Sequence, residues 1–189
     1  MTGGIRRTRK AWNVDWMAHC LTFSCYQRRR FFTGQVAPAW FQEALLRARD
    51  RAPFDLWVYV IMPEHVHVVL LPHEQVRIED ILWQMKRPFA RRVVVWVRRH
   101  SPGFLDRMAD VQGDGRVVHR FWQPGGGYDR NLRSVRDVRE KVQYIHENPV
   151  RRGLVDKAED WAWSSAREWT TGQVGTVPMD MATVPFLML

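Results

Sequence analysis

Two adjacent segments in the first half of the chain carry its densest β pattern. FDLWVYVIM (54–62) and HVHVVLL (65–71) are rich in β-branched and aromatic residues, and the break Pro63-Glu64 separates them. This pattern predicts two neighbouring strands joined by a turn. A looser alternation over 19–26 predicts an earlier strand, and a short strand is expected at about 128–132.

Three segments have sequence features that are typical of helices. Pro38 opens an apolar pattern that recurs every three or four positions to about Asp50, and a second such pattern runs from Ile78 to His100. Pro88 lies inside the second pattern, so we expect it to kink that helix or to split it. Ser134 is typical of a helix N-cap, and the helix it begins is expected to end at Asn148, before proline.

The order of these elements, β-α-β-β-α-β-α, predicts an α+β protein with a ferredoxin-like sandwich. In that architecture an antiparallel sheet carries its helices on one face. We expect one domain over 18–165, preceded by a basic N-terminal extension (1–17) and followed by a C-terminal tail (166–189). The segment 101–127 is expected to be a loop, and 170–189, with little charge and two prolines, is expected to be loosely held.

Composition adds a partner class to this picture. The 189 residues have a formal net charge of +9 at pH 7, and most of the 29 basic residues are arginine. Arginine binds phosphate oxygens in pairs, and the aromatic content leaves rings for stacking on bases, so nucleic acid is the favoured partner. The alternative is a basic surface with no such role. No apolar run is long enough for a membrane helix, and no secretory signal is expected.

The two cysteines do not indicate a disulfide framework. Cys20 and Cys25 lie five positions apart in a strand-like segment, which predicts that they point to opposite faces. A reducing cytoplasm is the expected compartment.

His65 and His67 are the first candidate for chemistry. Residues two apart on a strand face the same side, so both imidazoles leave the sheet together and form half of a divalent-metal site. A third ligand has to come from elsewhere. For an isolated pair of this kind, two histidines without a metal remain the alternative.

The last predicted helix supplies a second candidate pair. Tyr144 and Asn148 lie four positions apart, so they project from one helix face, one turn above the other. The spacing places a carboxamide oxygen one turn from a phenol. Spacing alone favours the alternative, in which Tyr144 is an aromatic residue at the core edge and Asn148 a helix C-terminal residue before proline.

These segments together resemble a known family. MPEHVHVVLLP (62–72) and KVQYIHENPVRRGLV (141–155), with FWQPGGGYDRNL (121–132) and LTFSCYQRRRFF (21–32), resemble the HUH single-tyrosine transposases. The similarity is greatest to the branch of REP-associated tyrosine transposases, and it covers roughly 18–165. That branch usually carries a Gly-Thr-Trp-Tyr-like motif near the N-terminus, whereas this chain has Trp12-Asn13-Val14-Asp15-Trp16 there.

The resemblance implies a set of roles. His65 and His67 correspond to metal ligands, Asn148 to the third ligand and Tyr144 to the nucleophile, on a helix near the C-terminus of the catalytic domain. The implied cofactor is Mg²⁺ or Mn²⁺. The implied reaction cleaves and rejoins single-stranded or hairpin DNA, palindromic repeats included, through a 5′-phosphotyrosine link.

The basic residues gain a role in the same way. Several of them would line a DNA groove, at a strand end, on the second helix and just past the last one: Arg28, Arg29, Arg30, Lys86, Arg87, Arg91, Arg92, Arg151 and Arg152. For any single one of these, a solvated surface arginine is the alternative. A DNA footprint of this kind is strongly dependent on salt.

Three classes of function therefore remain open. The first is a DNA transposase, a monomer or homodimer associated with the prokaryotic nucleoid and with no membrane partner. The second is a domesticated, non-catalytic protein that binds nucleic acid sequence-specifically. The third is a protein stabilised by structural zinc, which chelation would unfold.

Overall fold

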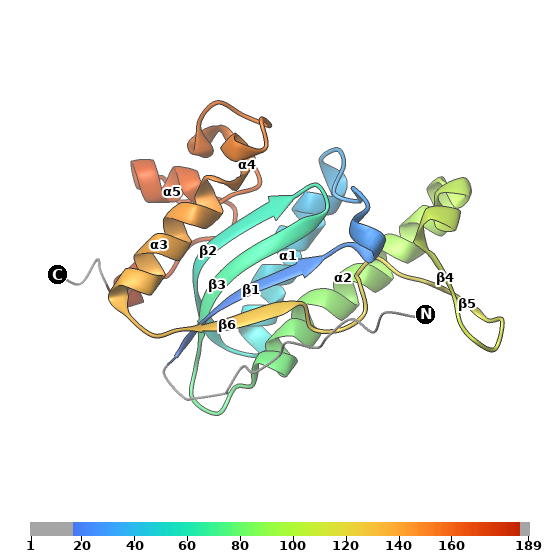
Figure 1. Cartoon of the computed structure of the whole chain (residues 1–189), viewed down its shortest axis with the longest axis horizontal. Coiled ribbons are helices and arrows are strands. Elements are labelled where there is room, and N and C mark those ends of the chain that lie inside the picture. The colour runs from blue at the N-terminus through green and yellow to red at the C-terminus, as the bar shows by residue number, and fades with distance from the viewer. Residues whose placement is uncertain (1–16, 186–189) are drawn as a thin grey trace, which may run out of the picture.

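The predicted strands form one antiparallel sheet. The structure is a computed structural model that describes residues 17–185, and the order of the four strands is β2-β3-β1-β6. Both β2 and β1 pair antiparallel with β3, and β6 pairs antiparallel with the outer side of β1 (Figure 1). The strand bounds are β1 Ala18–Ser24, β2 Phe54–Met62, β3 His65–Pro72 and β6 Tyr128–Leu132.

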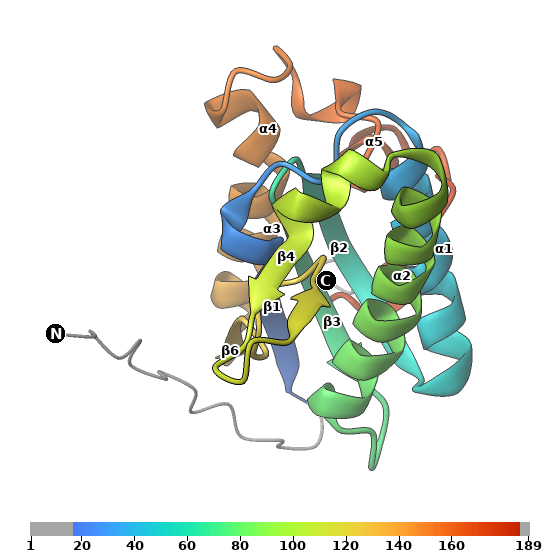
Figure 2. The ribbon, with the colours of Figure 1, turned by 90° about the vertical axis from the view of Figure 1, so that its right-hand side faces the viewer.

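One face of this sheet is covered by two helices. They are α1 (Val36–Arg51) and α2 (Ile78–His100), which lie side by side on one side of the sheet in Figure 2. Their apolar stripes pack against alternate strand residues, and Phe23, Phe41 and Phe89 form the aromatic centre of this core. The predicted α+β architecture is confirmed, and α1 and α2 form the helical layer on this face of the antiparallel sheet.

Pro88 does not divide α2. The helix is continuous from Ile78 to His100, so the expected split is wrong. Pro88 is exposed, and its neighbour Phe89 is buried against the sheet. Burial of the apolar stripe, which runs from Ile81 before the proline to Val97 after it, holds both halves of the helix against one core.

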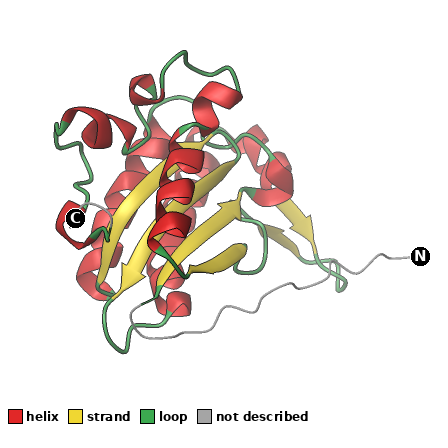
Figure 3. Cartoon of the chain, turned by 60° about the vertical axis from the view of Figure 1, so that its left-hand side comes forward, coloured by secondary structure: helices red, strands yellow, loops and turns green. Residues whose placement is uncertain are grey.

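The last long helix covers the opposite face. Ser134 accepts a hydrogen bond from the backbone N–H of Asp137 and begins α3 (Val135–His146), which α4 (Asn148–Arg151) follows. Its residues Val138, Val142 and Ile145 pack against Val69 on the sheet. The neighbours of Val69 along β3 point to the other face, which α1 and α2 cover. Helices therefore lie on both sides of the yellow strands in Figure 3.

The segment 101–127, expected to be a loop, contains regular structure. A 3₁₀ helix (Pro102–Met108) leads into a two-stranded hairpin of β4 (Ala109–Val111) and β5 (Val117–His119). Its turn contains Asp114-Gly115, with Gly115 at φ 80°. An Asp-Gly pair is a hairpin signal that the sequence interpretation overlooked.

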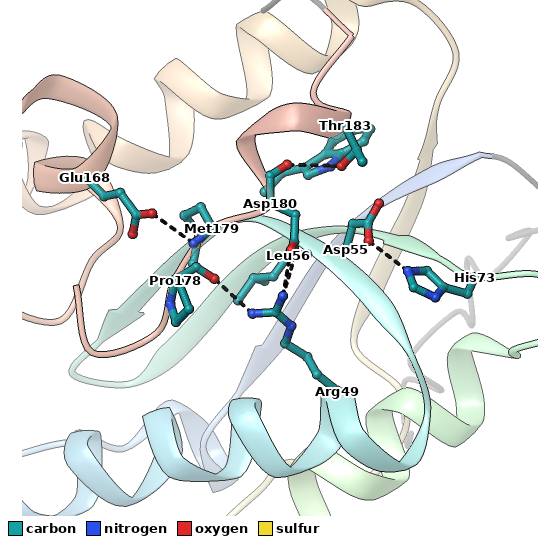
Figure 4. A network of polar contacts seen from close by, with 10 residues as sticks. Arg49, Asp55, Leu56, His73, Glu168, Pro178, Met179, Asp180 and Thr183 are labelled. Carbon is teal, nitrogen blue, oxygen red and sulfur yellow. Dashed lines mark hydrogen bonds and ion pairs between the residues drawn. The ribbon is translucent and has the colours of Figure 1, made fainter. Parts of the chain in front are cut away.

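The C-terminal tail is also better held than expected. After α5 (Ala166–Thr171), the chain returns to β2, where Asp180 accepts hydrogen bonds from the Leu56 backbone and from Arg49 at 2.7 Å each (Figure 4). Glu168 accepts a bond from the backbone N–H of Met179. These long-range polar contacts hold the tail although its sequence carries little charge. Residues 186–189, the end of the predicted loose segment, lie outside the described residues.

Two further sequence expectations concern the cysteines and membrane-spanning helices. Cys20 and Cys25 are both free and buried, one in each core layer, as predicted. None of the helices within 17–185 is long and apolar enough to span a membrane.

Gly127 provides a test of how β6 joins the sheet. Its φ is 78°, and a Cβ there would lie 2.2 Å from the carbonyl oxygen of Thr22. We expect Gly127→Ala to lower the free energy of unfolding by at least about 3 kcal/mol, since backbone strain and a steric clash combine. Urea denaturation measures this.

Gly125 is the matched control. It also has a positive φ, 95°, but a Cβ there meets nothing within 4 Å. Gly125→Ala should therefore cost only about 1 kcal/mol, the backbone effect alone. Equal losses in the two variants would show that the contact with β1 does not constrain the position.

Candidate active site

The two histidines of β3 lie on the side of the sheet that faces α3. They share this side with Val69, whereas Val66 and Val68 belong to the core under α1 and α2. Both are buried, and their Nε2 atoms lie 2.9 Å apart. The sequence prediction that both imidazoles leave the sheet together is confirmed.

Each imidazole is held at its other nitrogen. Nδ1 of His65 lies 3.1 Å from Oε1 of Glu64, in the turn between β2 and β3. Nδ1 of His67 lies 2.8 Å from Oγ1 of Thr22, because the pairing of β1 with β3 sets Thr22 opposite His67. The two side chains that fix the imidazoles therefore come from a turn and from a neighbouring strand.

The partners decide which nitrogens carry protons. An ionised carboxylate only accepts, so His65 carries its proton on Nδ1 and presents a lone pair at Nε2. The 2.9 Å contact between the Nε2 atoms is then a hydrogen bond if His67 donates from Nε2. Nδ1 of His67 accepts in turn from the hydroxyl of Thr22, so all four imidazole nitrogens have a partner.

Burial keeps both imidazoles neutral. Loss of hydration lowers the pKa of His67 to about 3, and the charges of protonated His65, of Arg151 and of Lys141 act in the same direction. Burial also lowers the pKa of His65, although the neighbouring Glu64 opposes this. Neutral imidazoles are the form that binds a cation.

Glu64 joins the imidazole pair to the segment after α3. It is buried, and its Oε1 also accepts a hydrogen bond from Nη1 of Arg152 at 2.9 Å. Burial alone would raise the pKa of Glu64, but His65 and Arg152 outweigh burial, so the pKa is lowered. Oε2 of Glu64 is buried without a hydrogen-bond partner in the described part of the chain. The contacts of Oε1 with His65 and Arg152 are therefore the ones that stabilise this buried carboxylate.

Tyr144 stands on α3 with its ring half-exposed. The guanidinium of Arg151 lies 4.1 Å from the ring centroid, and Nζ of Lys141 lies 5.2 Å from it. Arg151 also donates to the Tyr144 backbone carbonyl at 2.9 Å. Since the charges of the same two cations act on His67, the ring and the imidazole pair share one basic environment.

Asn148, the first residue of α4, faces the end of α3. Its side-chain nitrogen donates to the carbonyls of Tyr144 and Ile145, which leaves Oδ1 as the atom able to accept a cation. Within the described residues it makes no hydrogen bond to either imidazole. The role of Asn148 as third ligand stays a prediction, as do the roles of His65, His67 and Tyr144.

The predicted DNA contacts separate into three groups. The charges of Arg28 and Arg152 lower the pKa of His65, and that of Arg151 lowers the pKa of His67. The backbone of Arg28 is in the left-handed region, with φ 54°. Arg29 donates to the carbonyl of Arg107, and Arg30 is exposed. The remaining predicted contacts, Lys86, Arg87, Arg91 and Arg92, lie on α2, beyond the other face of the sheet.

Sequence reasoning missed Glu64, Thr22 and Lys141. Glu64 had a signal, because it directly precedes His65 in the sequence. Lys141 lies one turn before Tyr144, on the same helix face. Thr22 had none, since only the strand register places it beside His67.

The donor set fits an open cation site better than a closed structural one. No cluster of three or more His, Cys, Asp and Glu side chains suited to a metal occurs within 17–185. Burial raises the pKa of Cys20 to about 11 and also raises that of Cys25, so neither thiol is disposed to bind zinc. The 2.9 Å between the Nε2 atoms is close to the ~3.0 Å that separates adjacent ligands about 2.1 Å from an octahedral ion.

The chain is similar in sequence to two named transposases. The chain is 25% identical over 126 residues to a REP-associated tyrosine transposase of Haemophilus influenzae, and 25% identical over 125 residues to one of Escherichia coli K12. The matches span 66% of this chain and 66% and 61% of those two relatives. No family model matches the chain.

A solved structure shares the fold. It is described as a REP-associated tyrosine transposase bound to a REP hairpin, and it matches with a TM-score of 0.64 at 21% identity. The match covers 89% of this chain and 88% of that one. The segment with Trp12 and Trp16, where this chain departs from the branch's usual motif, lies outside the described residues.

The proton positions are open to direct measurement. We expect long-range ¹⁵N–¹H NMR spectra of the metal-free protein at pH 7 to show His65 protonated at Nδ1 and His67 at Nε2, both neutral. Glu64→Ala removes the acceptor of His65, so this variant should show a mixture of His65 tautomers. A wild-type His65 protonated at Nε2 would contradict the hydrogen-bond chain.

Proposed function

This chain resembles the REP-associated tyrosine transposases in sequence and in fold, and we propose that it cleaves and rejoins single-stranded or hairpin DNA. The observation that carries the proposal is the convergence of two neutral imidazole nitrogens on the sheet face beneath the helix of Tyr144. In a cell it would act on DNA, at the nucleoid of a prokaryote. The protein would work as a monomer or a homodimer.

Three side chains would hold the cofactor. They are His65 and His67 through Nε2 and Asn148 through Oδ1, and Mg²⁺ or Mn²⁺ is the ion proposed. When bound, it would polarise the scissile phosphodiester and offset the negative charge that develops there. Neutral ligands leave the net charge of the site positive, which suits an anionic substrate.

Tyr144 would act as the nucleophile. Its phenolic oxygen would bond to the phosphorus, the bond from phosphorus to the 3′-oxygen would break, and a free 3′-OH would leave. The phenolic proton would be lost and the departing oxygen would gain one. Arg151 and Lys141 lie beside the ring, where they would neutralise the arriving phosphate.

The covalent link explains how joining can proceed without a nucleotide cofactor. The phosphodiester energy would be kept in the 5′-phosphotyrosine. Attack by a 3′-OH on that phosphorus would then restore the phenol and seal a strand. Arg28, Arg151 and Arg152 would hold the phosphates next to the cleaved position.

Tyr144→Phe tests the nucleophile. The variant keeps the ring, so we expect it to fold and to bind single-stranded DNA with near wild-type affinity. It should form no adduct that survives denaturation when incubated with Mn²⁺ and a hairpin oligonucleotide from the DNA that flanks its own coding sequence. Denaturing gels and mass spectrometry measure the adduct.

Tyr128→Phe is the matched control. Tyr128 lies on β6 opposite Thr22 and is 50% exposed, against 49% for Tyr144. This variant should retain adduct formation. An adduct on the Tyr144→Phe protein would refute the assignment, and DNA binding without any adduct in the wild type would favour the non-catalytic alternative.

Thr22 tests the cation site without reference to cleavage. A cation on both Nε2 atoms requires His67 to carry its proton on Nδ1, so Thr22 must change from donor to acceptor. Thr22→Val cannot accept, and we expect it to weaken Mn²⁺ binding about 10–100-fold, as measured by electron paramagnetic resonance. Thr22→Ser should restore binding, whereas equal affinity of the valine variant would contradict this role.

A further inference from the structure

A groove of about 900 Å³ runs along α2 on the other side of the molecule from the imidazole pair. One wall is the outer side of α2, and the other is the segment from Val118 to Gly126, which leads into β6. The buried side of α2 packs on the sheet face of Phe23, whereas His65 and His67 lie on the opposite face. The groove is therefore separate from the candidate active site.

The groove is strongly basic. Lys86, Arg87, Arg91, Arg98 and Arg120 line it, and Glu79 is the one acidic residue among the described residues of its lining. Arg120 is paired with Asp110. None of the other three guanidiniums, those of Arg87, Arg91 and Arg98, forms an ion pair with a carboxylate in the described part of the chain.

These three arginines form a row. At 100° per residue, Arg87, Arg91 and Arg98 lie within about 40° of one another around the helix. At 1.5 Å per residue, their Cα positions are separated by about 6 and 10 Å along it. A small anion would contact one of them, so the row fits a polymer that carries a charge on each repeat.

An exposed indole lies at one end of this row. Trp83 is 55% exposed, and the guanidinium of Arg87 lies 4.2 Å from the centroid of its ring. The ring of Trp83 does not contribute to the core, because the side of α2 that packs on the sheet carries Met85 and Phe89 instead. An exposed aromatic face beside a row of cations is the arrangement on which an unpaired base stacks.

The opposite wall offers open backbone. Nζ of Lys86 donates to the carbonyl oxygen of Gly125 at 3.1 Å and so ties this wall to α2. Gly125 lines the groove and is exposed, and a Cβ there would meet nothing within 4 Å. A strand lying in the groove would meet the arginines of α2 on one wall and, on the other, the exposed backbone of Gly125 together with the side chains of Val118 to Trp122.

We propose that this groove is a second strand-binding site, which holds the phosphates and at least one unstacked base of single-stranded DNA. It deepens the proposed function by giving the DNA a path around the β6 edge of the sheet. The binding itself does not depend on cleavage, so Tyr144→Phe should leave it intact.

The charge of the groove is tested with a (dT)20 oligonucleotide. The variant Arg87→Gln/Arg91→Gln/Arg98→Gln removes three phosphate contacts, so the slope of log K against log[salt] should become shallower by about 2. Fluorescence anisotropy over a range of salt concentrations measures this slope. The control variant Arg47→Gln/Arg51→Gln/Arg167→Gln changes the net charge equally at exposed positions outside the groove.

The control should keep a slope close to that of the wild type. Equal slopes for the two triple variants would overturn the proposal, because the effect would then be one of net charge alone. A wild-type slope in the groove variant would overturn it as well. A blunt duplex that loses as much affinity as (dT)20 would show that the occupant is not single-stranded.

Trp83 tests the base contact. Trp83→Ala should weaken (dT)20 binding about tenfold with an unchanged salt slope, and Trp83→Phe should retain most of the affinity. A (dT)20 strand that contains 5-iodouracil should crosslink to Trp83 on irradiation, as mapped by mass spectrometry. Unchanged affinity in Trp83→Ala, or crosslinks only near His67, would overturn the assignment. If the wild-type protein binds (dT)20 in the groove but forms no adduct at Tyr144, the cleavage proposal is refuted and the groove proposal stands.

Discussion

The pairing of β1 with β3 is the constraint on which the candidate active site depends. This register places Thr22 opposite His67 and Ser24 opposite His65, in the middle of the sheet. The imidazoles have no room to turn there, and each nitrogen needs a partner because burial makes an unsatisfied polar group costly. A slip of one residue would point both histidines into the aromatic core under α1 and α2.

The sheet also separates two basic regions of the molecule. Successive residues of β1 and β3 point alternately toward α1 and α2 and toward α3. Tyr144 and Lys141 lie on α3, and Arg151, in α4, contacts the Tyr144 ring, so all three lie on the α3 side. On the other side α2 carries its arginine row away from the sheet. The β6 strand, at one edge of the sheet, lies between the two regions and is held against Thr22 by the close approach of Gly127.

Electrostatic contacts connect parts of the chain that are distant in sequence. Arg152, just after α4, reaches Glu64 between β2 and β3, and that carboxylate in turn orients His65. A buried carboxylate is costly to keep charged, so its two partners must be in place at once. The position of the segment after Tyr144 is thereby coupled to the orientation of an imidazole on the sheet.

Local patterns in the sequence determined much of this protein. The strands over 54–62 and 128–132, the helix over 78–100 and the common face of His65 and His67 follow from periodicities of two and 3.6, which neighbouring residues set by themselves. The motif pair around His65 and Tyr144 also indicated the family that the chain resembles. The roles predicted for the site residues are implied by that resemblance.

Only the tertiary structure decided the rest. Strand register placed Thr22 at His67, and the fold brought Arg152 to Glu64 and Asp180 back to Leu56. The same is true of the assignment of α3 and α2 to opposite faces and of the continuity of α2 through Pro88. Each of these depends on contacts between residues far apart in the chain, and local propensity carries no information about such contacts.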